Sequence, residues 1–409
     1  MIAPGPKPPW WTDLASRASG YLPVTAERTL KRYLSLMLPL TGLRVPVVLL
    51  RGPVRPSGRE GTVLIAGRHP LVKYLPGRFF AREPQRSHLG KVSVWGLSHA
   101  LKRLQPPADL TIAVVDRHSA RLFFDEDYLA VPEWVGSWLT VPEEPEKLGR
   151  ANAKVREDLR RIRSKGLHPV ISHAETDFDL FYRTMYVPFI RNRFGDLAFV
   201  SNPRYLRRRF RHGGMLWVQR GGERLAGHAF AQYKQTLYAL AMGTANGESA
   251  PMKQGALVAA YYYLIQYAHQ QECTRLDLGA SRPSLHDGVL RYKRKWGVVL
   301  SEKPDTYYDF LVRWNRLDGV VAEFLSHTSL IFRDRSGLSA ISGIGHEDLA
   351  GASDAWAAHH SIWIPGLRHL YLVAASGWQP DICGPPDTSL INPNTLGDGG
   401  PRALVAASA

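Results

Sequence analysis

The pattern of apolar and polar positions divides the chain into short strands and helices that alternate over most of its length. Runs of aliphatic and β-branched residues bounded by turn residues predict strands at 45–50, 62–67 and 111–116. In ANAKVREDLRRIRSKG (151–166), apolar residues recur after four and three positions, which predicts a helix with one buried face. We therefore expect an α/β (α+β) protein whose mixed, mostly antiparallel sheets are flanked by helices.

The order of elements is clearest between residues 167 and 310. A strand is followed by a helix that bends near Pro188, and then by a second helix that Asn202 can cap. Three strands come next, with a glycine-rich first turn and Lys234–Gln235 at the second. A long helix, a strand, a helix beginning near Asp287 and two final strands complete the predicted order.

Changes in composition mark the boundaries of the predicted parts. A stretch rich in proline and acidic residues separates a first unit, residues 1–150, from a basic connecting helix over 151–166. The second unit spans 167–310, and a helical extension is expected over 311–345. Residues 346–409 are rich in small and polar residues, which predicts a disordered or loosely attached tail.

The charge of the chain points to anionic partners. Its 409 residues carry a formal net charge of +16, which suits nucleic acid, a phosphorylated cofactor, a sugar nucleotide or an acidic membrane face. A general arginine bias of the source genome would give the same excess, so that alternative stays open. Cys273 and Cys383 lie far apart and form no CxxC pair, which favours a reducing cytoplasm over a disulfide framework or a zinc site.

The N-terminal segment indicates neither secretion nor a membrane span. It lacks a basic stretch followed by an apolar core, so no signal peptide is predicted. The apolar stretch 33–50 is interrupted by prolines, a glycine and an arginine, and it is too short to span a bilayer. A peripheral membrane contact through Leu34, Met37 and Leu38 remains an alternative.

The common motifs of covalent and metal catalysis are missing from the sequence. There is no GxSxG and no HExxH, and His359–His360 lies among alanines and serines, so no metal is expected. Acyl transfer to an amine needs none of these groups. It needs the two substrates held in line and a donor for the developing oxyanion.

The stretch LDLGASRPSLHDGVLRYKRKWG (276–297) concentrates polar groups at the end of a predicted strand. Asp277 alternates with leucines, so it either orients or deprotonates an attacking amine, or binds the amides of the next loop. Ser281 and Arg282 come next and are expected to bind the substrate. Arg282 can bind a phosphate or carboxylate, or form a brace with Asp287. Asp287 is also a good helix N-cap, and that role competes with one as a base or substrate ligand.

This stretch and FYRTMYVPFIRNRFG (181–195) resemble a bacterial family of GNAT-type acyltransferases related to the Fem peptidyltransferases. The resemblance covers roughly residues 90–310 and is strongest over 166–300. It implies two tandem GNAT-like domains, of which the first is usually degenerate and the second is active.

The resemblance also implies roles for particular residues. Tyr292–Lys293 matches an aromatic–lysine pair beside the reaction centre, so we expect Lys293 and Tyr292, together with Asp277, to be catalytic. The helix with the bend lines the acceptor cleft in that family. The turn before the long helix faces the phosphates of the donor. These two segments contribute the remaining candidates, which are Tyr182, Tyr186 and Arg193 for the acceptor, and Lys253, Gln254, Gly255 and Ala256 for the cofactor.

Three functions follow from the resemblance. The first is transfer of an acyl group from acyl-CoA, by direct attack, to an amine on a small molecule, amino sugar, glycan or peptide of the cell envelope. The second is Fem-like transfer from aminoacyl-tRNA, which the basic runs at 150–165 and 204–211 favour. The third is a non-catalytic binding protein that has kept the fold.

Overall fold

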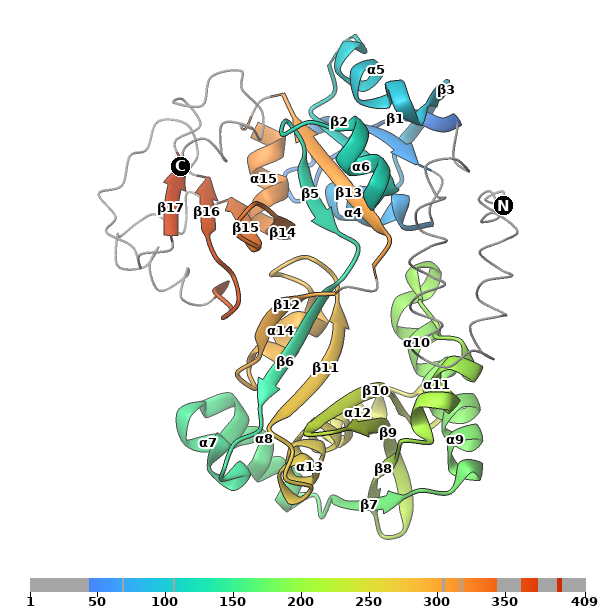
Figure 1. Ribbon diagram of the computed structural model, residues 1–409, viewed down its shortest axis with the longest axis vertical. Helices are drawn as coiled ribbons and strands as arrows, with labels where there is room; N and C mark the ends of the chain where they lie inside the picture. Colours follow the sequence, from blue (N-terminus) through green and yellow to red (C-terminus); the bar gives the residue numbers. More distant parts are fainter. Residues whose placement is uncertain are drawn as a thin grey trace.

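The computed structural model describes residues 44–67, 70–105, 107–303, 306–315, 317, 319–343, 362–373 and 388–391. Within these ranges the strands form a ten-stranded sheet, in the order β17-β16-β15-β14-β5-β13-β4-β2-β1-β3, and a seven-stranded sheet, in the order β12-β6-β11-β10-β9-β8-β7. The two sheets lie one above the other along the long axis of the molecule (Figure 1). The predicted α/β class, with mixed sheets flanked by helices, is confirmed.

The ten-stranded sheet is covered by helices on both faces. Its strands are β1 (Arg44–Pro53), β2 (Glu60–Gly67), β3 (Gln85–Ser93), β4 (Leu110–Asp116), β5 (Leu129–Pro132), β13 (Tyr308–Trp314), β14 (Leu330–Arg333), β15 (Leu338–Gly343), β16 (Leu370–Val373) and β17 (Thr388–Ile391). One core contains α4 (Tyr74–Phe79) and α15 (Gly319–Thr328), through Phe79 and Phe324. The opposite core contains α5 (Leu97–Arg103) and α6 (Arg117–Phe123).

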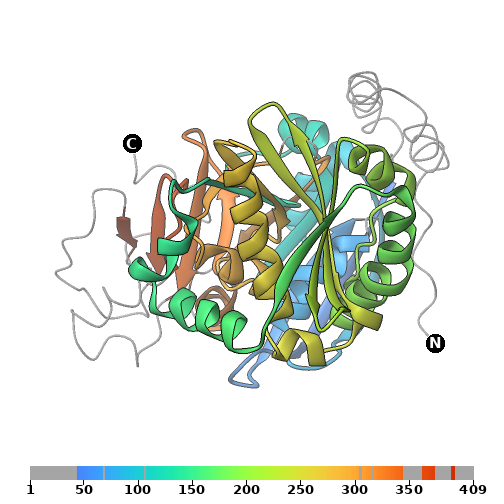
Figure 2. The same cartoon turned by 90° about the horizontal axis from the view of Figure 1, so that it is seen from below.

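The seven-stranded sheet also has a core on each face. Its strands are β6 (Val135–Thr140), β7 (His168–Ser172), β8 (Gly213–Arg220), β9 (Glu223–Tyr233), β10 (Thr236–Thr244), β11 (Arg275–Ser281) and β12 (Val299–Glu302). Its helices are α7 (Leu148–Ala151), α8 (Ala153–Ser164), α9 (Glu175–Phe181), α10 (Val187–Phe194), α11 (Pro203–Phe210), α12 (Ala250–Lys253), α13 (Ala256–Gln270) and α14 (Gly288–Arg294). Helices α8 and α13 pack on one face, and α9 and α11 pack on the other (Figure 2).

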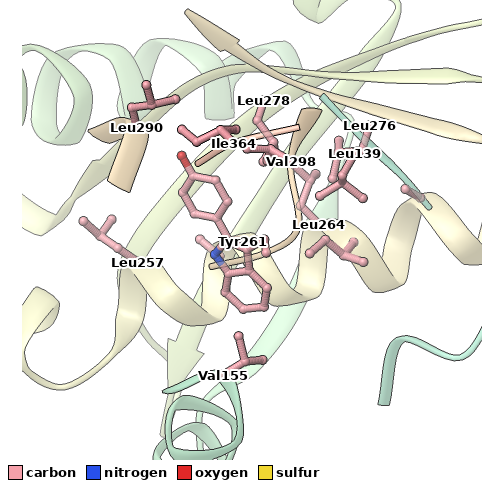
Figure 3. Close-up of a cluster of buried hydrophobic side chains, with 14 of the residues drawn as sticks. Leu139, Val155, Leu257, Tyr261, Leu264, Leu276, Leu278, Leu290, Val298 and Ile364 are labelled. Carbon is pink, nitrogen blue, oxygen red and sulfur yellow. The ribbon is translucent and has the colours of Figure 1, made fainter. Parts of the chain in front are cut away.

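Alternating apolar residues explain how the core under α13 forms. Leu276 and Leu278 of β11 both point toward α13, where they meet Tyr261 and Leu264 (Figure 3). Leu290 of α14 belongs to the same cluster, so its burial helps to hold α14 beside the end of β11. The core therefore holds the polar stretch after β11 in place.

The local elements predicted for the second half of the chain are confirmed. The order from β7 to β12 is the predicted one, and Asn202 and Asp287 cap α11 and α14 as expected. The expected bend is a π-helical turn, Tyr182–Tyr186, that leads into Pro188 near the start of α10. Proline has no N–H to donate, so a widened turn there loses little helical hydrogen bonding.

Two strands cross between the predicted units. β6 lies within 1–150, yet it pairs with β11 and β12 in the seven-stranded sheet. β13 was expected as the last strand of the second unit, but it pairs with β4 and β5 in the ten-stranded sheet. The apolar run Phe310–Val312 is buried throughout, which suits the interior of the larger sheet.

The C-terminal predictions need correction. Helix α15 lies in the predicted helical extension, but β14 and β15 of that segment belong to the ten-stranded sheet. Part of the predicted tail is also folded, since β16 pairs in parallel with β15 and its residues are buried. The short apolar run Leu370–Val373 is part of the hydrophobic core. The small and polar residues around it in the sequence led to the prediction of a tail.

Some predictions fall on residues outside the described ranges. These include the membrane contact through Leu34, Met37 and Leu38, the pair His359–His360, and Cys383. Across the part of the chain that the structure describes, none of the helices combines the length and the apolar character needed to cross a bilayer.

Candidate active site

The parallel strands β10 and β11 separate soon after they meet. Their pairing is limited to Thr236 with Arg275, Leu237 with Leu276, and Tyr238 with Asp277. Beyond this point β10 continues to Thr244 beside β9, whereas β11 continues beside β6. The edge of β10 after Tyr238 therefore has no registered strand partner among the described residues.

Irregular backbone marks both sides of this split. The register of β10 with β9 shifts between Ala239 and Ala241, which is a bulge at the first residues after the pairing ends. The register of β11 with β6 shifts between Asp277 and Ala280. Gly279 lies in this second irregularity with a φ of 74°, a conformation that favours glycine.

The buried side chain of Lys293 forms hydrogen bonds with the end of β11. Its side chain is 2% exposed, and Nζ donates to Gly279 O at 3.0 Å, Ala280 O at 2.9 Å and Ser281 Oγ at 3.1 Å. All three N–H groups of an ammonium are thereby used. Burial lowers the pKa of Lys293 to about 7, although Asp277 and Asp287 oppose this shift. These contacts hold the backbone at the end of β11, and the expected catalytic role of Lys293 stays a prediction.

Asp277 binds a backbone amide of the following turn, which is one of the roles that the sequence allowed. Its Oδ1 accepts a hydrogen bond from Gly279 N at 2.7 Å and so shapes the turn that Lys293 holds. The flanking Leu276 and Leu278 are buried, as their alternation predicted. The other carboxylate oxygen of Asp277 has no hydrogen bond to a described residue and could still face an amine.

The side chain of Tyr292 packs against the core around α13. Its ring packs edge-on against Tyr261 with centroids 5.0 Å apart, and Lys295 Nζ lies 4.0 Å from its ring centroid. Lys295 is in turn paired with Asp158 of α8 at 2.5 Å. Burial raises the pKa of the Tyr292 hydroxyl well above its usual value. The two neighbouring side chains of α14 thus have different partners, and a catalytic role for Tyr292 stays a prediction.

Arg282 and Asp287 do not form the ion pair considered from the sequence. Asp287 Oδ1 accepts from Val289 N and Leu290 N at 3.0 Å each, and its other oxygen lies 3.8 Å from Arg78 Nη2. Arg282 instead stacks on Trp134, with its guanidinium carbon 3.7 Å from the ring centroid. Asp287 is thus an N-cap that also joins the two sheets through Arg78.

Two of the three residues predicted for the acceptor, Tyr182 and Tyr186, bind the loop between α10 and α11. Tyr182 Oη donates to Ser201 O at 2.9 Å, and Tyr186 Oη accepts from Ser201 N at 3.1 Å. Arg193 is exposed, and its guanidinium lies over the rings of Phe189 and Phe194. The two tyrosines therefore position the loop around Ser201, whereas Arg193 lies on the surface.

The residues predicted for the cofactor lie at the start of α13. Gly255 has a φ of 93° and breaks the helix between α12 and α13, and no side chain caps the first turn of α13. Lys253 is exposed, whereas Ala256 is fully buried. Gln254 is half-buried, and its side-chain oxygen is enclosed without a hydrogen-bond partner. An uncapped first turn offers backbone N–H groups and a positive dipole end to an anion.

Sequence reasoning missed His228, Tyr74 and Trp134. His228 of β9 is 2% exposed and packs near Tyr261, and burial lowers its pKa to about 4, with a smaller effect from Lys293. Tyr74 and Trp134 come from the first half of the chain and meet Arg282. A period-two pattern would have placed His228 on the α13 face of β9, but no local signal reveals the contacts of Tyr74 and Trp134.

The basic residues of α11 and α8 differ in how many of them form ion pairs or stack on aromatic rings. On α11, Arg207 pairs with Asp179, Arg211 pairs with Glu175, and Arg209 lies over the ring of Tyr238. On α8, by contrast, Lys154 and Arg163 are exposed and have no ion pair within the described residues. The free positive charge of the pair of helices therefore lies mainly on α8.

Comparison with known proteins gives matches in structure alone. No protein-family model matches the chain, and no curated protein matches it in sequence. FemX is similar to it with 11% identity and a TM-score of 0.34, over 67% of this chain and 90% of that one. The L-PGS of Bacillus licheniformis shows 14% identity and a TM-score of 0.31, over 64% and 83%. A tandem GNAT protein from the clavulanic acid biosynthesis pathway shows 11% identity and a TM-score of 0.26, over 63% and 80%.

Proposed function

We propose that the protein transfers an acyl group from an activated donor to an amine, with the donor held in the split between β10 and β11. The observation that carries this proposal is the end of strand pairing at Tyr238 and Asp277. An extended donor with amide groups could pair with the free edge of β10, as an added strand does. The uncapped start of α13 would bind its phosphates.

The proposed reaction needs no covalent enzyme intermediate. The lone pair of the amine attacks the carbonyl carbon of the donor, the C–N bond forms, and the C–S or C–O bond of the donor breaks. The proton lost by nitrogen goes to the leaving thiol or hydroxyl. Lys293 fixes the backbone of Gly279 and Ala280 during this reaction, and Asp277 holds the same turn by accepting a hydrogen bond from Gly279 N.

Acyl-coenzyme A is the donor we rank first. The start of α13 combines uncapped amides with the exposed Lys253, and Gly255 adds no side chain where a phosphate would approach. Aminoacyl-tRNA is the second candidate, and the unpaired basic residues of α8 favour it. A non-catalytic protein that binds the same ligands is the third.

Calorimetric titration separates these donors. We expect acetyl-coenzyme A to bind the wild-type protein and uncharged or charged tRNA to bind much more weakly. Binding of charged tRNA alone would move the proposal to the second donor. Binding of neither, by a folded protein, would contradict a donor site in the split.

A further inference from the structure

Three distant segments meet around one arginine between the two sheets. Arg282 directly follows β11, Trp134 lies in the short link from β5 to β6, and Tyr74 begins α4. The guanidinium carbon of Arg282 lies 3.7 Å from the ring centroid of Trp134 and 5.0 Å from that of Tyr74. The link from β5 to β6 and the end of β11 lie together between the upper and lower sheets (Figure 1).

Arg282 is buried without a hydrogen-bond partner. The residue is 9% exposed, and its Nη1 is enclosed with no partner. No hydrogen bond or ion pair joins its guanidinium to any residue in the described ranges. A buried cation in this condition is costly, and proteins normally satisfy it with a carboxylate or a ligand.

The nearby carboxylates are engaged elsewhere. Asp287 caps α14 and lies 3.8 Å from Arg78, while Glu133 accepts a hydrogen bond from Trp134 Nε1 at 3.0 Å. Burial raises the pKa of Glu133, which weakens it further as a permanent counter-charge. The ring of Tyr74 also has Arg78 nearby, with the guanidinium carbon 5.6 Å from its centroid. Two guanidinium groups therefore approach one aromatic ring.

Arg224 shows what a complete version of this arrangement looks like. Its guanidinium carbon lies 4.3 Å from the ring centroid of Trp217, much as Arg282 lies over Trp134. Arg224 also has an ion pair with Asp177 at 2.9 Å. The same stacked geometry thus includes a carboxylate at one site and lacks it at the other.

We propose that Arg282, with Tyr74 and Trp134 as walls and Arg78 beside it, binds an anionic group of the amine acceptor, either a phosphate or a carboxylate. This inference rests on the proposed function, because Arg282 is adjacent to Ser281, which Lys293 holds at the strand end. A guanidinium fork can bind two oxygens of either anion. The acceptor then carries both an amine and an acidic group, and both halves of the chain contribute to its site.

The exposed side chain of Phe199 belongs to the edge of this site. It is 62% exposed, and its ring centroid lies 5.9 Å from that of Trp134. Phe199 lies in the loop that Tyr182 and Tyr186 clamp through Ser201. The loop predicted to face the acceptor thus reaches the same tryptophan that covers Arg282.

Anion titrations of purified full-length variants test this site. Inorganic phosphate, pyrophosphate and acetate would be titrated by calorimetry into the wild-type protein, Arg282→Gln, Arg282→Lys and the control Arg224→Gln. We expect at least one anion to bind the wild type, with binding at least tenfold weaker in both Arg282 variants and unchanged in Arg224→Gln. Preference for phosphate or for acetate identifies the acidic group.

Arg282→Lys keeps the positive charge, so it serves as the folded variant if Arg282→Gln is unstable. Equal binding of the anion by wild type and Arg282→Lys would place the anion elsewhere and overturn the inference. Failure of all three anions to bind the wild type would overturn it as well. If acetyl-coenzyme A still bound in either case, the proposed donor site would stand without this subsite.

Discussion

At the scale of single residues, Lys293 holds the end of β11 through hydrogen bonds. Its ammonium is buried and donates to two carbonyl oxygens and one hydroxyl of the same short segment. Removing the ammonium leaves those acceptors buried without a donor. A buried, fully bonded lysine therefore acts on the geometry of the split through the backbone.

We expect Lys293→Met to lower the free energy of unfolding by about 3 kcal/mol, because hydrogen bonds to a buried charge are lost and their acceptors stay unpaired. Arg291→Met, on the exposed side of the same helix, should change it by less than about 0.5 kcal/mol. Urea unfolding followed by circular dichroism measures both. A change in Lys293→Met no larger than that of the control would contradict the structural role of Lys293.

The buried lysine also makes stability depend on pH. Its pKa falls from an ordinary value of 10.5 to about 7 in the folded protein. Between these values the unfolded chain binds one more proton at this site than the folded chain, so its contribution to stability rises with pH. The penalty is complete below pH 7 and disappears toward the ordinary pKa. The difference in unfolding free energy between wild type and Lys293→Met should therefore grow from pH 7 to pH 9, and a constant difference would contradict the shift.

At the scale of elements, the break between α12 and α13 prepares the predicted phosphate site. Gly255 adopts a φ of 93°, which ends α12 and starts α13 with a first turn that no side chain caps. An L-residue at this position is strained, and an added Cβ would also come within 3.3 Å of the Arg161 side chain. The glycine thus sets the direction in which α13 begins.

Gly255→Ala should destabilise the protein by about 1–2 kcal/mol and weaken binding of a phosphate-containing donor. Gly288→Ala is the matched control, because Gly288 is helical and an added Cβ meets nothing within 4 Å. Thermal unfolding and donor titration of both variants provide the test. Equal effects from the two substitutions would show that the conformation at Gly255 is unimportant.

The sequence predicted where helices and strands lie along the chain better than it predicted which elements pair with one another. Helix α14 could be placed because Asp287 and the apolar spacing act within a few residues of one another. The exchange of β6 and β13 could not, because a strand sequence does not specify which sheet edge it joins. At the site, the burial of Leu276 and Leu278 followed from alternation, whereas the stacking of Arg282 on Trp134 depends on that exchange.

At the scale of the whole molecule, the crossed strands tie the two sheets together. β5 and β6 are joined by Glu133 and Trp134 alone, although they lie in different sheets. β6 also lies between β11 and β12, and its residues Val135 and Leu139 are buried in the core that contains α13. Neither sheet is complete without residues from the other half of the chain.

We therefore expect one cooperative unfolding transition for the full chain, with the same midpoint by near-UV and far-UV circular dichroism. A fragment of residues 151–310 should fail to fold, because it lacks β6 and exposes the edges of β11 and β12. Two separate transitions, or a fragment that unfolds cooperatively, would show that the sheets are independent.

Hydrogen exchange of the split, with and without donor, tests most directly whether β10 and α13 bind the acyl donor. Saturating acetyl-coenzyme A should slow amide exchange in residues 239–244 and 256–258, while peptides from β1 and β3 exchange as before. Unchanged exchange in both segments, in protein that calorimetry shows to have bound the donor, would place the donor elsewhere and contradict the assignment of the split as the active site.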